Sequence, residues 1–549
     1  MSEWLPKGRE LADRGAIVLT LFAIPLAMYY LSGVVAGERG PYWLADNFDP
    51  EYAYLFNALN LINLRVPELV EHPGTTLHVL GAVVIKLLTL GETSFEVTER
   101  VLSDPEYFLS AISQTLRVLN LVSQIVLGMV CYFLTRSAVT AVLIQSPIVC
   151  FAYSFDALSR VSPEPLLLLD VTMLAGIVVL VIGRPAVLSE KTLLYLLSII
   201  SGFGIATKFT FVPILCLPLV MLQSVRSRAL FLTGTLMAAL VFTLPILPRY
   251  RVVLSWTGNL LIRSGSYGTG DATIISNFWS NLADVLWYQP SMSCLVGVLA
   301  VACVVAQRQL GLGGGHQQES LLRVSRVALG LLIAQICQFA AVAKHPGSFA
   351  YLIPILGLSG LTTALVYMVL KALLLPSEAV RTGIGLLLVI GLVYSGSGQW
   401  RKVESSLSEY RERRTAAADL ERLRQHDFSD CLQIFHYRAS STAYAEYFGA
   451  EWSGVRYYGP RIQSKYGPRT YFYQIWSKRL FSASGVVVNL PEIVGKSDGC
   501  TIFQGTPFEG DYERFRPPIQ FHDQCGGKRE ALYVLGRKCH RAVGAGVLS

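Results

Sequence analysis

The sequence predicts a mainly α protein: a polytopic transmembrane helical bundle followed by a small extracytoplasmic α/β domain. Of the 549 residues, 52% are hydrophobic and only 15% are charged, and the mean hydropathy is positive, at +0.46. Such a composition is typical of an integral membrane protein and excludes an ordinary soluble globule. Long apolar stretches recur up to about residue 398, and the composition becomes polar after it.

A helix that spans the bilayer needs about 20 mostly apolar residues. About eleven stretches approach that length, and several of them are short enough to be tilted or broken. They are residues 16–35, 112–133, 138–153, 164–183, 192–207, 209–223, 229–247, 286–306, 327–343, 349–370 and 383–397.

The basic residues indicate the orientation of the bundle. Lys7, Arg9 and Arg14 precede the first stretch, which favours a cytoplasmic N-terminus. This stretch lacks a clear small-residue cleavage site, so it is interpreted as a retained span. With eleven spans the C-terminus then faces outward. Every inside loop is net basic or nearly so, and these loops hold Arg136, Arg184, Lys191, Arg226, Arg228, Arg308, Arg323, Arg326, Lys371 and Arg381.

The apolar stretch 77–90 is the main ambiguity of this topology. If it were a full span, all later loops would invert and the basic ones would lie outside. Its length also allows a re-entrant or interfacial helix, and this interpretation is preferred. It makes residues 36–111 the first external loop, which carries the acidic residues Glu92, Glu96, Glu99, Asp104 and Glu106.

Two domains are therefore expected, a transmembrane module over residues 1–398 and an extracytoplasmic domain over residues 399–549. Residues 401–424 form a charged, helix-like stretch, and short alternating runs such as 485–490 are typical of strands. The external domain is expected to form two disulfides in an oxidising compartment, with three pairings open, among Cys431, Cys500, Cys525 and Cys539. A metal site there is disfavoured because no CxxC pair occurs.

A cluster of carboxylates marks the chemistry. Asp46, Asp49 and Glu51 lie just outside the first span and next to Tyr52. Charges near hydrocarbon are costly unless they have a function, although a merely solvated loop is the alternative. A carboxylate here could take a proton from an acceptor hydroxyl.

Further polar residues lie at span ends that the topology places on the same outer face. Cations there could hold a phosphate and stabilise its developing charge. The alternatives are snorkelling side chains, charges favoured by helix dipoles, and, for the segment at residue 72, a simple turn. The residues at span ends are Arg117, Glu164, Lys208, Lys344 and His345, and His72 lies within the first external loop, ahead of the interfacial stretch.

These segments resemble, in their order and sidedness, those of the GT-C glycosyltransferases, most closely the lipid A aminoarabinose transferases and the protein O-mannosyltransferases. The resemblance covers about residues 1–400 and does not extend to the C-terminal domain. The matching segments are Asp49-Pro50-Glu51-Tyr52, His72-Pro73-Gly74, Leu116-Arg117, Pro163-Glu164, Gly204-Ile205-Ala206-Thr207-Lys208, Lys344-His345-Pro346 and Tyr351-Leu352-Ile353-Pro354.

The resemblance implies an inverting transfer of a sugar from a polyprenyl-phosphate-linked donor. Asp49 matches the family's catalytic aspartate. Many relatives have Asp followed directly by Glu, whereas Pro50 intervenes here, so Asp46 or Glu51 could share or take the role. Lys208, Lys344, Arg117 and His345 are the expected ligands of the donor phosphate, and Glu164, His72, Tyr52 and Tyr351 are further substrate-site candidates.

No cofactor is certain from the sequence. Some relatives bind a divalent metal ion near the aspartate, and the possible ligands here are Asp49, Glu51, Glu164, His72 and His345. The expected partners are the polyprenyl-phosphate sugar donor, an acceptor glycan, lipid or protein, and membrane lipid. No nucleic-acid partner is expected.

The preferred location is a bacterial inner membrane, with the active site and C-terminal domain facing the periplasm, and the endoplasmic reticulum is the alternative. A flippase or transporter for a lipid-linked sugar is the alternative function. That function predicts repeated halves and charges buried in mid-span. No internal repeat is evident in the sequence, and the charges gather at span ends.

Overall fold

The computed structural model describes residues 4–45, 47–71, 73–146, 151–265, 268, 270, 277–310, 316–345, 349–373, 378–437, 439–474, 477–495, 499–505, 523–526 and 530–538. The chain forms two compact units. The membrane unit comprises Met1–Val35, Val70–Leu77 and Ser113–Glu404, and the loop–sheet unit comprises Ala36–Leu69, His78–Ile112 and Ser405–Ser549. Most of residues 36–111, the loop predicted to be external, thus falls in one unit with the C-terminal domain, whereas the sequence grouped it with the spans.

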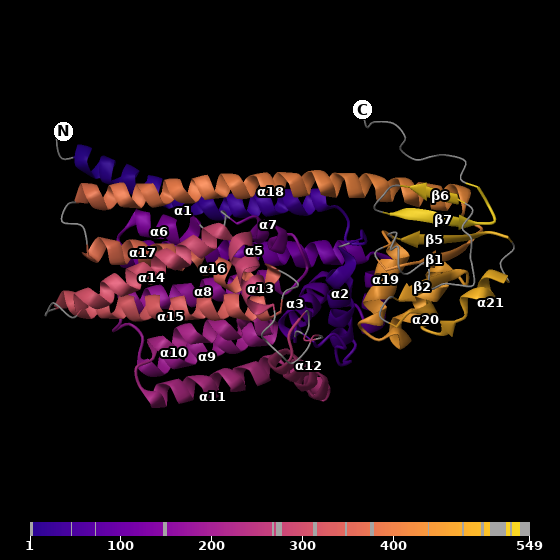
Figure 1. Ribbon diagram of the computed structural model, residues 1–549, viewed down its shortest axis with the longest axis horizontal. Helices are drawn as coiled ribbons and strands as arrows, with labels where there is room; N and C mark the ends of the chain where they lie inside the picture. Colours follow the sequence, from indigo (N-terminus) through magenta and orange to yellow (C-terminus); the bar gives the residue numbers. More distant parts are fainter. Residues whose placement is uncertain are drawn as a thin grey trace. The chain divides into compact units, whose positions relative to one another are not determined.

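The membrane unit is helical throughout its described part (Figure 1). Its elements are α1 (Trp4–Arg39), α5 (Pro105–Thr135), α6 (Ala138–Gln145), α7 (Ala152–Leu158), α8 (Glu164–Gly183), α9 (Glu190–Thr207), η2 (Phe209–Leu215), α10 (Cys216–Met221), α11 (Val225–Phe242), η3 (Leu244–Arg249), α12 (Tyr250–Ile262), α13 (Phe278–Tyr288), α14 (Pro290–Leu310), α15 (His316–Lys344), η5 (Phe349–Leu352), α16 (Ile353–Gly357), α17 (Ser359–Leu373) and α18 (Glu378–Asp427). The ends of α1 and α18 and the start of α5 belong to the loop–sheet unit.

Seven helical segments in the described part of the chain are long and apolar enough to cross a membrane. They are Leu19–Arg39, Pro105–Thr135, Glu164–Gly183, Val225–Phe242, Pro290–Leu310, Leu321–Lys344 and Ala350–Lys371. The predicted bundle is confirmed, but its count of eleven spans is not. The reason is local: η2 contains Pro213 and α10 adds only six residues, and the predicted span 138–153 is divided between α6 and α7.

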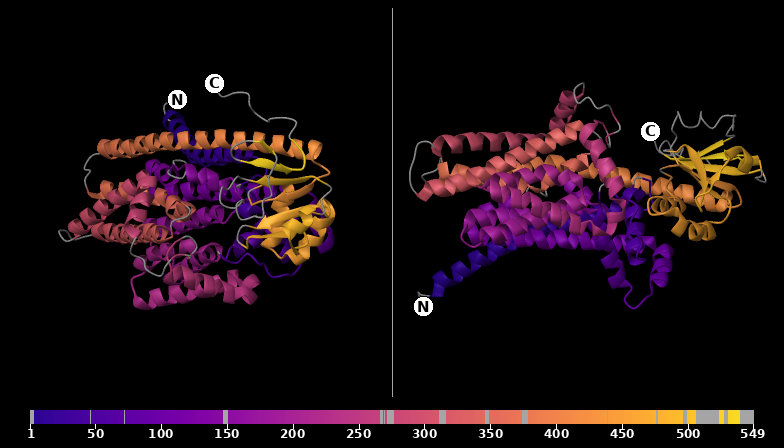
Figure 2. Two further views of the ribbon diagram at one scale, coloured as in Figure 1. Left: turned by 45° about the vertical axis from the view of Figure 1, so that its right-hand side comes forward. Right: turned by 90° about the horizontal axis from the view of Figure 1, so that it is seen from below.

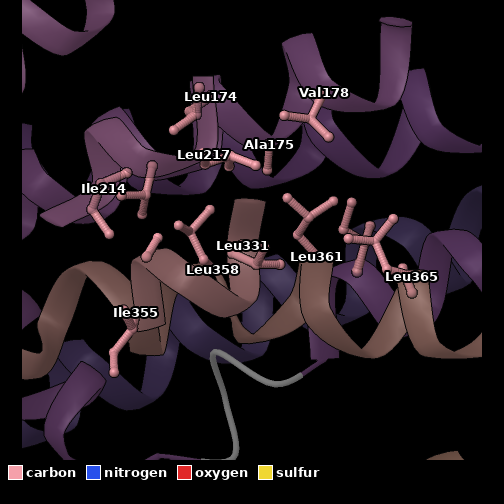
Figure 3. Close-up of a cluster of buried hydrophobic side chains, with 14 of the residues drawn as sticks. Leu174, Ala175, Val178, Ile214, Leu217, Leu331, Ile355, Leu358, Leu361 and Leu365 are labelled. Atoms are coloured by element: carbon pink, nitrogen blue, oxygen red, sulfur yellow. The ribbon is translucent and has the colours of Figure 1, made fainter. Parts of the chain in front are cut away.

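The core of the membrane unit is built where several helices meet. The helices α14, α15 and α17 lie side by side (Figure 1). Leucine, isoleucine, valine and alanine side chains of α8, η2, α10, α15, α16 and α17 interdigitate there (Figure 3). Lipid is as apolar as these side chains, so close packing holds the helices together here more than hydrophobic exclusion does.

The loop–sheet unit combines the helices of the first external loop with a mixed sheet. Its helices are α2 (Phe48–Ile62), α3 (Thr75–Leu88, which begins in the membrane unit), α4 (Ser94–Ser103), α19 (Thr442–Glu451), α20 (Val455–Tyr466) and α21 (Leu490–Gly495). Its strands are β1 (Leu432–Phe435), β2 (Thr470–Gln474), β3 (Arg479–Ser482), β4 (Val487–Val488), β5 (Thr501–Gly505), β6 (Asp523–Gly526) and β7 (Ala531–Leu535).

The strands lie in the order β4-β3-β2-β1-β5-β7-β6. Figure 1 labels β6, β7, β5, β1 and β2, and Figure 2 shows the sheet from two further directions. The central strand β1 pairs in parallel with β2 on one side and with β5 on the other, and the remaining pairs are antiparallel. The connection from β1 to β2 contains α19 and α20, as a parallel crossover requires. The predicted α/β character of the C-terminal domain is therefore confirmed.

Alternation along the strands separates the two faces of the sheet. On one face Cys431, Ile502 and Val534 pack with Leu420 and Phe428 from the end of α18 and the turn after it. The other face carries a second cluster, which also includes the α21 side chains, and its members are Leu432, Ile434, Tyr473, Leu480, Phe503, Tyr471, Val488, Leu490, Ile493 and Tyr533.

Helix α2 packs closely against α19. A Cβ added to Gly449 would lie 2.9 Å from the carbonyl oxygen of Tyr52, so this position of α19 favours a residue without a side chain. Asn57 Nδ2 donates to Ser453 Oγ at 2.8 Å, and Asn60 Nδ2 donates to the carbonyl oxygen of Ser453 at 2.7 Å. The helix that follows the candidate base is thereby fixed to the C-terminal domain.

Candidate functional site

Asp49 lies at the start of α2 and is exposed. Its φ of −100° and ψ of 113° are extended rather than helical, because a residue that precedes proline is excluded from the α region. The carboxylate oxygen Oδ2 accepts a hydrogen bond from the hydroxyl of Tyr437, at 3.1 Å. Asp46, the neighbouring candidate, lies outside the described residues.

Glu51 occupies a different environment from Asp49. It is completely buried, and its Oε1 lies 4.0 Å from Nη2 of Arg39, which is also buried. Arg39 additionally donates from Nε to Asn47 Oδ1, at 2.7 Å. The two acidic side chains on either side of Pro50 therefore have different roles. Asp49 is exposed, whereas Glu51 neutralises the buried guanidinium of Arg39.

Tyr52 fixes α2 one turn after Asp49. Its hydroxyl donates to Oε1 of Glu106 at 2.8 Å, and Oε2 of the same carboxylate accepts from the backbone N–H of Tyr42 at 2.8 Å. Burial, reinforced by the nearby carboxylates Glu106 and Glu446, raises the pKa of Tyr52 well above its usual value. The hydroxyl therefore keeps its proton and acts as a donor that anchors the loop.

A second group of predicted residues meets in the membrane unit. Nζ of Lys208 lies 2.5 Å from Oε1 of Glu164, and the two side chains are only 9% and 8% exposed. Glu164 begins α8, and Lys208 directly follows the last residue of α9. A negative charge is favoured at a helix N-terminus and a positive one at a C-terminus, so both helix dipoles stabilise the pair.

Tyr351 joins this pair. Nζ of Lys208 lies 5.2 Å from the centre of its ring, within the range of a cation–π contact. The hydroxyl of Thr207 is hydrogen-bonded to that of Thr76, at 2.8 Å. The segment that follows His72-Pro73-Gly74 therefore reaches the position next to Lys208, while His72 itself lies outside the described residues.

Lys344 and His345 make other contacts. The ammonium group of Lys344 donates to the carbonyl oxygens of Leu260 (3.1 Å) and Leu261 (2.6 Å), near the C-terminal end of α12. The ring nitrogens of His345 lie 2.9 Å from the Gly265 oxygen and 3.0 Å from the Leu260 oxygen. The contacts of Lys344 are those expected of a cation at a helix C-terminus, and the described contacts of Lys344 and His345 do not include Lys208 or Glu164.

Arg117 packs against α1. Its Nη2 donates to Gln114 Oε1 at 2.6 Å, and its guanidinium carbon lies 5.8 Å from the centre of the Tyr29 ring. A Cβ on Gly33 would lie 2.8 Å from Nη1 of Arg117. The structure thus gives Arg117 a neighbourhood distinct from that of Lys208.

Two polar residues escaped the sequence analysis. Tyr437 was hidden because it lies 388 residues from Asp49 in the chain, and no local pattern links them. Asp170 is fully buried within α8, and neither carboxylate oxygen has a hydrogen-bond partner among the described residues. A Cβ on Gly204 would lie 2.4 Å from its Oδ2. Asp170 is a single acidic residue within an apolar stretch, and this isolated charge is the sequence feature that could have identified it.

The described residues contain no group of three or more His, Cys, Asp or Glu side chains that could hold a metal ion. Two of the possible metal ligands also have cationic partners, since Glu51 pairs with Arg39 and Glu164 with Lys208. Metal dependence stays a prediction.

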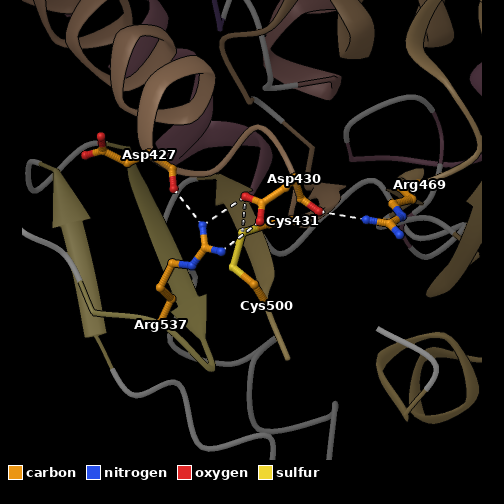
Figure 4. Close-up of a disulfide and its surroundings, with 6 residues drawn as sticks. All are labelled: Asp427, Asp430, Cys431, Arg469, Cys500 and Arg537. Atoms are coloured by element: carbon orange, nitrogen blue, oxygen red, sulfur yellow. Dashed lines mark hydrogen bonds and ion pairs between the residues drawn. A yellow bond between two sulfur atoms is a disulfide. The ribbon is translucent and has the colours of Figure 1, made fainter. Parts of the chain in front are cut away.

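A disulfide joins Cys431, just before β1, to Cys500, just before β5, with the Cα atoms 4.9 Å apart (Figure 4). Asp430 precedes Cys431 in the chain, and its carboxylate accepts two hydrogen bonds from the guanidinium of Arg537, of 2.9 and 2.7 Å. Cys525 is also disulfide-bonded, and Cys539 lies outside the described residues. The bridge therefore fixes the two parallel strands β1 and β5 at their amino ends.

No protein-family model matches the chain, and a search of curated proteins finds no match either. Solved structures do resemble it. ArnT from Cupriavidus metallidurans bound to undecaprenyl phosphate is 13% identical, with 95% of this chain and 98% of that chain covered, and the TM-score is 0.52. The apo state of the same protein gives 13% identity, the same coverage and a TM-score of 0.51.

The archaeal oligosaccharyltransferase AglB from Archaeoglobus fulgidus, in complex with an inhibitory peptide and a dolichol-phosphate, is 10% identical over 82% of this chain and 69% of that chain, with a TM-score of 0.42. The likeness to ArnT, the lipid A aminoarabinose transferase, extends over nearly the whole of both chains. The predicted resemblance is thus confirmed at the level of the fold: the chain has an ArnT-like fold.

Proposed function

We propose that this protein is a membrane glycosyltransferase that takes a sugar from a polyprenyl-phosphate-linked donor and transfers it to an acceptor on the periplasmic face of a bacterial inner membrane. The observation that carries the proposal is the ArnT-like fold over 95% of the chain. The exposed carboxylate of Asp49 in the first external loop supports it further.

Asp49 serves as the general base. Its carboxylate accepts the proton of the acceptor hydroxyl as the hydroxyl oxygen attacks the anomeric carbon, and the bond from that carbon to the phosphate oxygen breaks. The electron pair leaves with the polyprenyl phosphate. A single displacement of this kind inverts the anomeric configuration.

Lys208 supports the departing phosphate. A phosphodiester carries one negative charge, and the released monoester gains a second, so a cation stabilises the transition state more than the ground state. Lys208 suits this role because it is held in a nearly buried position, where a charge acts more strongly than in water.

The test is donor turnover by purified full-length protein in lipid nanodiscs. A panel of undecaprenyl-phosphate-linked sugars is supplied together with lipid A and an envelope glycan extract, and free undecaprenyl phosphate is measured by mass spectrometry. Release that depends on acceptor, with a new glycosidic product of inverted configuration, supports the proposal. In proteoliposomes, a donor that crosses the bilayer without losing its sugar would instead indicate a flippase and overturn it.

A further inference from the structure

The hydroxyl of Tyr437 connects the C-terminal sheet to Asp49. The tyrosine lies two residues after the end of β1 at Phe435, with His436 between them. Strand β1 has β2 on one side and β5 on the other, and both are parallel to it. The chain order thus reverses at β1, and the carboxyl end of a strand at such a switch point is where α/β sheets present side chains to ligands.

The contact is supported by aromatic packing. The ring of Phe48, the residue before Asp49, meets the Tyr437 ring edge to face, with centres 6.2 Å apart. Phe48 is 1% exposed and also contacts Tyr444 and Phe448 of α19, with ring centres at 5.3 and 5.0 Å. The backbone that carries Asp49 therefore packs against the C-terminal domain, next to the Tyr437 hydroxyl that donates a hydrogen bond to the Asp49 carboxylate.

We infer that Tyr437 is a positioning residue for the base, so that the C-terminal domain is part of the catalytic apparatus rather than an appendage. This inference rests on the proposed function, in which Asp49 takes the acceptor proton. A donor at Oδ2 fixes the plane of the carboxylate and so directs Oδ1, and a base must be held in place to act efficiently. A hydrogen bond to the charged form also favours that form over the protonated one.

Other titratable groups surround this contact. Tyr444, buried in α19, interacts electrostatically with Asp49, Tyr437 and Glu451, and burial raises its pKa well above the usual value. Tyr444 is therefore neutral across the working range of pH. Glu451 lies at the last position of α19.

The test is Tyr437→Phe, which removes one hydroxyl and keeps the ring that contacts Phe48. We expect kcat for sugar transfer to fall about 10- to 100-fold at neutral pH, while KM for the donor changes less than about twofold. We also expect the acid limb of the pH profile of kcat/KM to move to higher pH, because a carboxylate without its donor is protonated more easily. Tyr471→Phe, which removes a hydroxyl from β2 of the same sheet, is the matched control and should leave the profile unchanged.

The outcomes separate the inference from the proposed function. If Asp49→Asn is inactive while Tyr437→Phe has the wild-type kcat and pH profile, the positioning role is wrong and the base assignment stands. If Asp49→Asn itself turns over normally, the proposed base is wrong. Should Tyr437→Phe reduce thermal stability, Phe48→Leu, which loosens the same segment without removing a hydroxyl, should lower kcat without moving the acid limb. A limb that moves equally in both variants would overturn the inference.

Discussion

Nζ of Lys208 lies 2.5 Å from Oε1 of Glu164, and both side chains are almost completely removed from solvent. A buried ion pair of this kind is weak evidence for stability, because the desolvation of two charges offsets much of their attraction. The pair lies where the start of α8 meets the end of α9, and Lys208 also contacts the ring of Tyr351. This position is consistent with a lysine that is held in place to bind an anionic ligand.

The double substitution Lys208→Met with Glu164→Gln distinguishes a structural pair from a phosphate ligand. Removal of the lysine alone leaves a buried carboxylate unpaired and should cost about 3–5 kcal/mol of stability. Neutralisation of both partners should restore most of that stability but leave kcat/KM for the donor at least roughly tenfold below wild type, which corresponds to about 1.4 kcal/mol. Thermal unfolding and single-turnover kinetics in nanodiscs provide the two measurements.

A double variant with wild-type kinetics would show that Lys208 serves only the packing of α8 and α9. Arg411, which pairs with Glu38 at 2.8 Å and is 57% exposed, offers the control: Arg411→Met should change neither the stability nor the kinetics by much, because exposed pairs contribute little.

Asp49→Asn should abolish nearly all transfer and leave donor binding intact. The amide keeps the size of the side chain but cannot take a proton, and loss of a positioned general base typically costs about 100- to 10,000-fold in rate. Donor binding is measured by native mass spectrometry with an undecaprenyl-phosphate sugar. Glu51→Gln is the comparison: because Glu51 is buried against Arg39, we expect it to lower stability more than the rate per folded molecule. The reverse pattern would transfer the role of base to Glu51.

Glu451 should make the loop–sheet unit less stable as the pH rises. Burial raises the pKa of this carboxyl to about 7, so the folded state holds a proton that the unfolded state loses near pH 4.5. The free energy of unfolding should therefore decrease between about pH 4.5 and pH 7. The stabilisation that the Glu451 carboxyl provides is fully present only below that range of pH.

Glu451→Gln, which is neutral throughout, should flatten this dependence when melting temperatures are compared at pH 5 and pH 8. Glu412→Gln removes an exposed carboxyl from α18 and should leave the slope as it is in wild type. Equal slopes in wild type and Glu451→Gln would contradict the prediction.

Cys431→Ser should destabilise the sheet. The bridge to Cys500 spans 69 residues, and loss of a native disulfide of this kind costs about 2–4 kcal/mol of unfolding free energy. Reduction of the wild-type protein also opens the disulfide of Cys525, so it should produce a loss at least as large. Cys294→Ser changes an exposed free thiol and should have no measurable effect in the same denaturation experiment; a comparable loss there would point to a non-specific cause.

Cysteine labelling tests the orientation. Residue 92 should react with a membrane-impermeant maleimide in intact cells, whereas residue 308, at the exposed end of α14, should react only after permeabilisation. The expectation follows from the excess of Lys and Arg in the predicted inside loops. Labelling of position 92 from the cytoplasmic side would mean that residues 77–90 cross the membrane.

The sequence predicted the bundle and the α/β domain because hydropathy and strand alternation are local patterns. Helix α8 begins and ends where its apolar run does, at Glu164 and Gly183. The same logic failed for residues 209–223, where Pro213 and Pro218 divide an apolar run into short pieces. Apolar composition alone does not reveal how long a helix will be.

The candidate site was accessible to sequence reasoning only in part. Glu164 and Lys208 are each marked by a helix end, so the position of each was predictable, but their mutual contact depends on how α8 and α9 pack. The environment of Glu51 and the partner of Asp49 could not be predicted. Both depend on long-range contacts, and the hydroxyl of Tyr437 comes from a distant part of the chain.

The packing of α2 on α19 has a consequence for biosynthesis. Asn57 and its hydrogen-bond partner Trp452 are 395 residues apart, and synthesis at about 5–20 residues per second delays the arrival of α19 by roughly 20–80 s. Throughout that interval Phe48, which is 1% exposed in the finished protein, lacks the rings of Tyr444 and Phe448 of α19 against which it packs. Apolar surface exposed in this way favours aggregation, and a chain terminated before residue 442 is expected to leave this loop without its α19 partner.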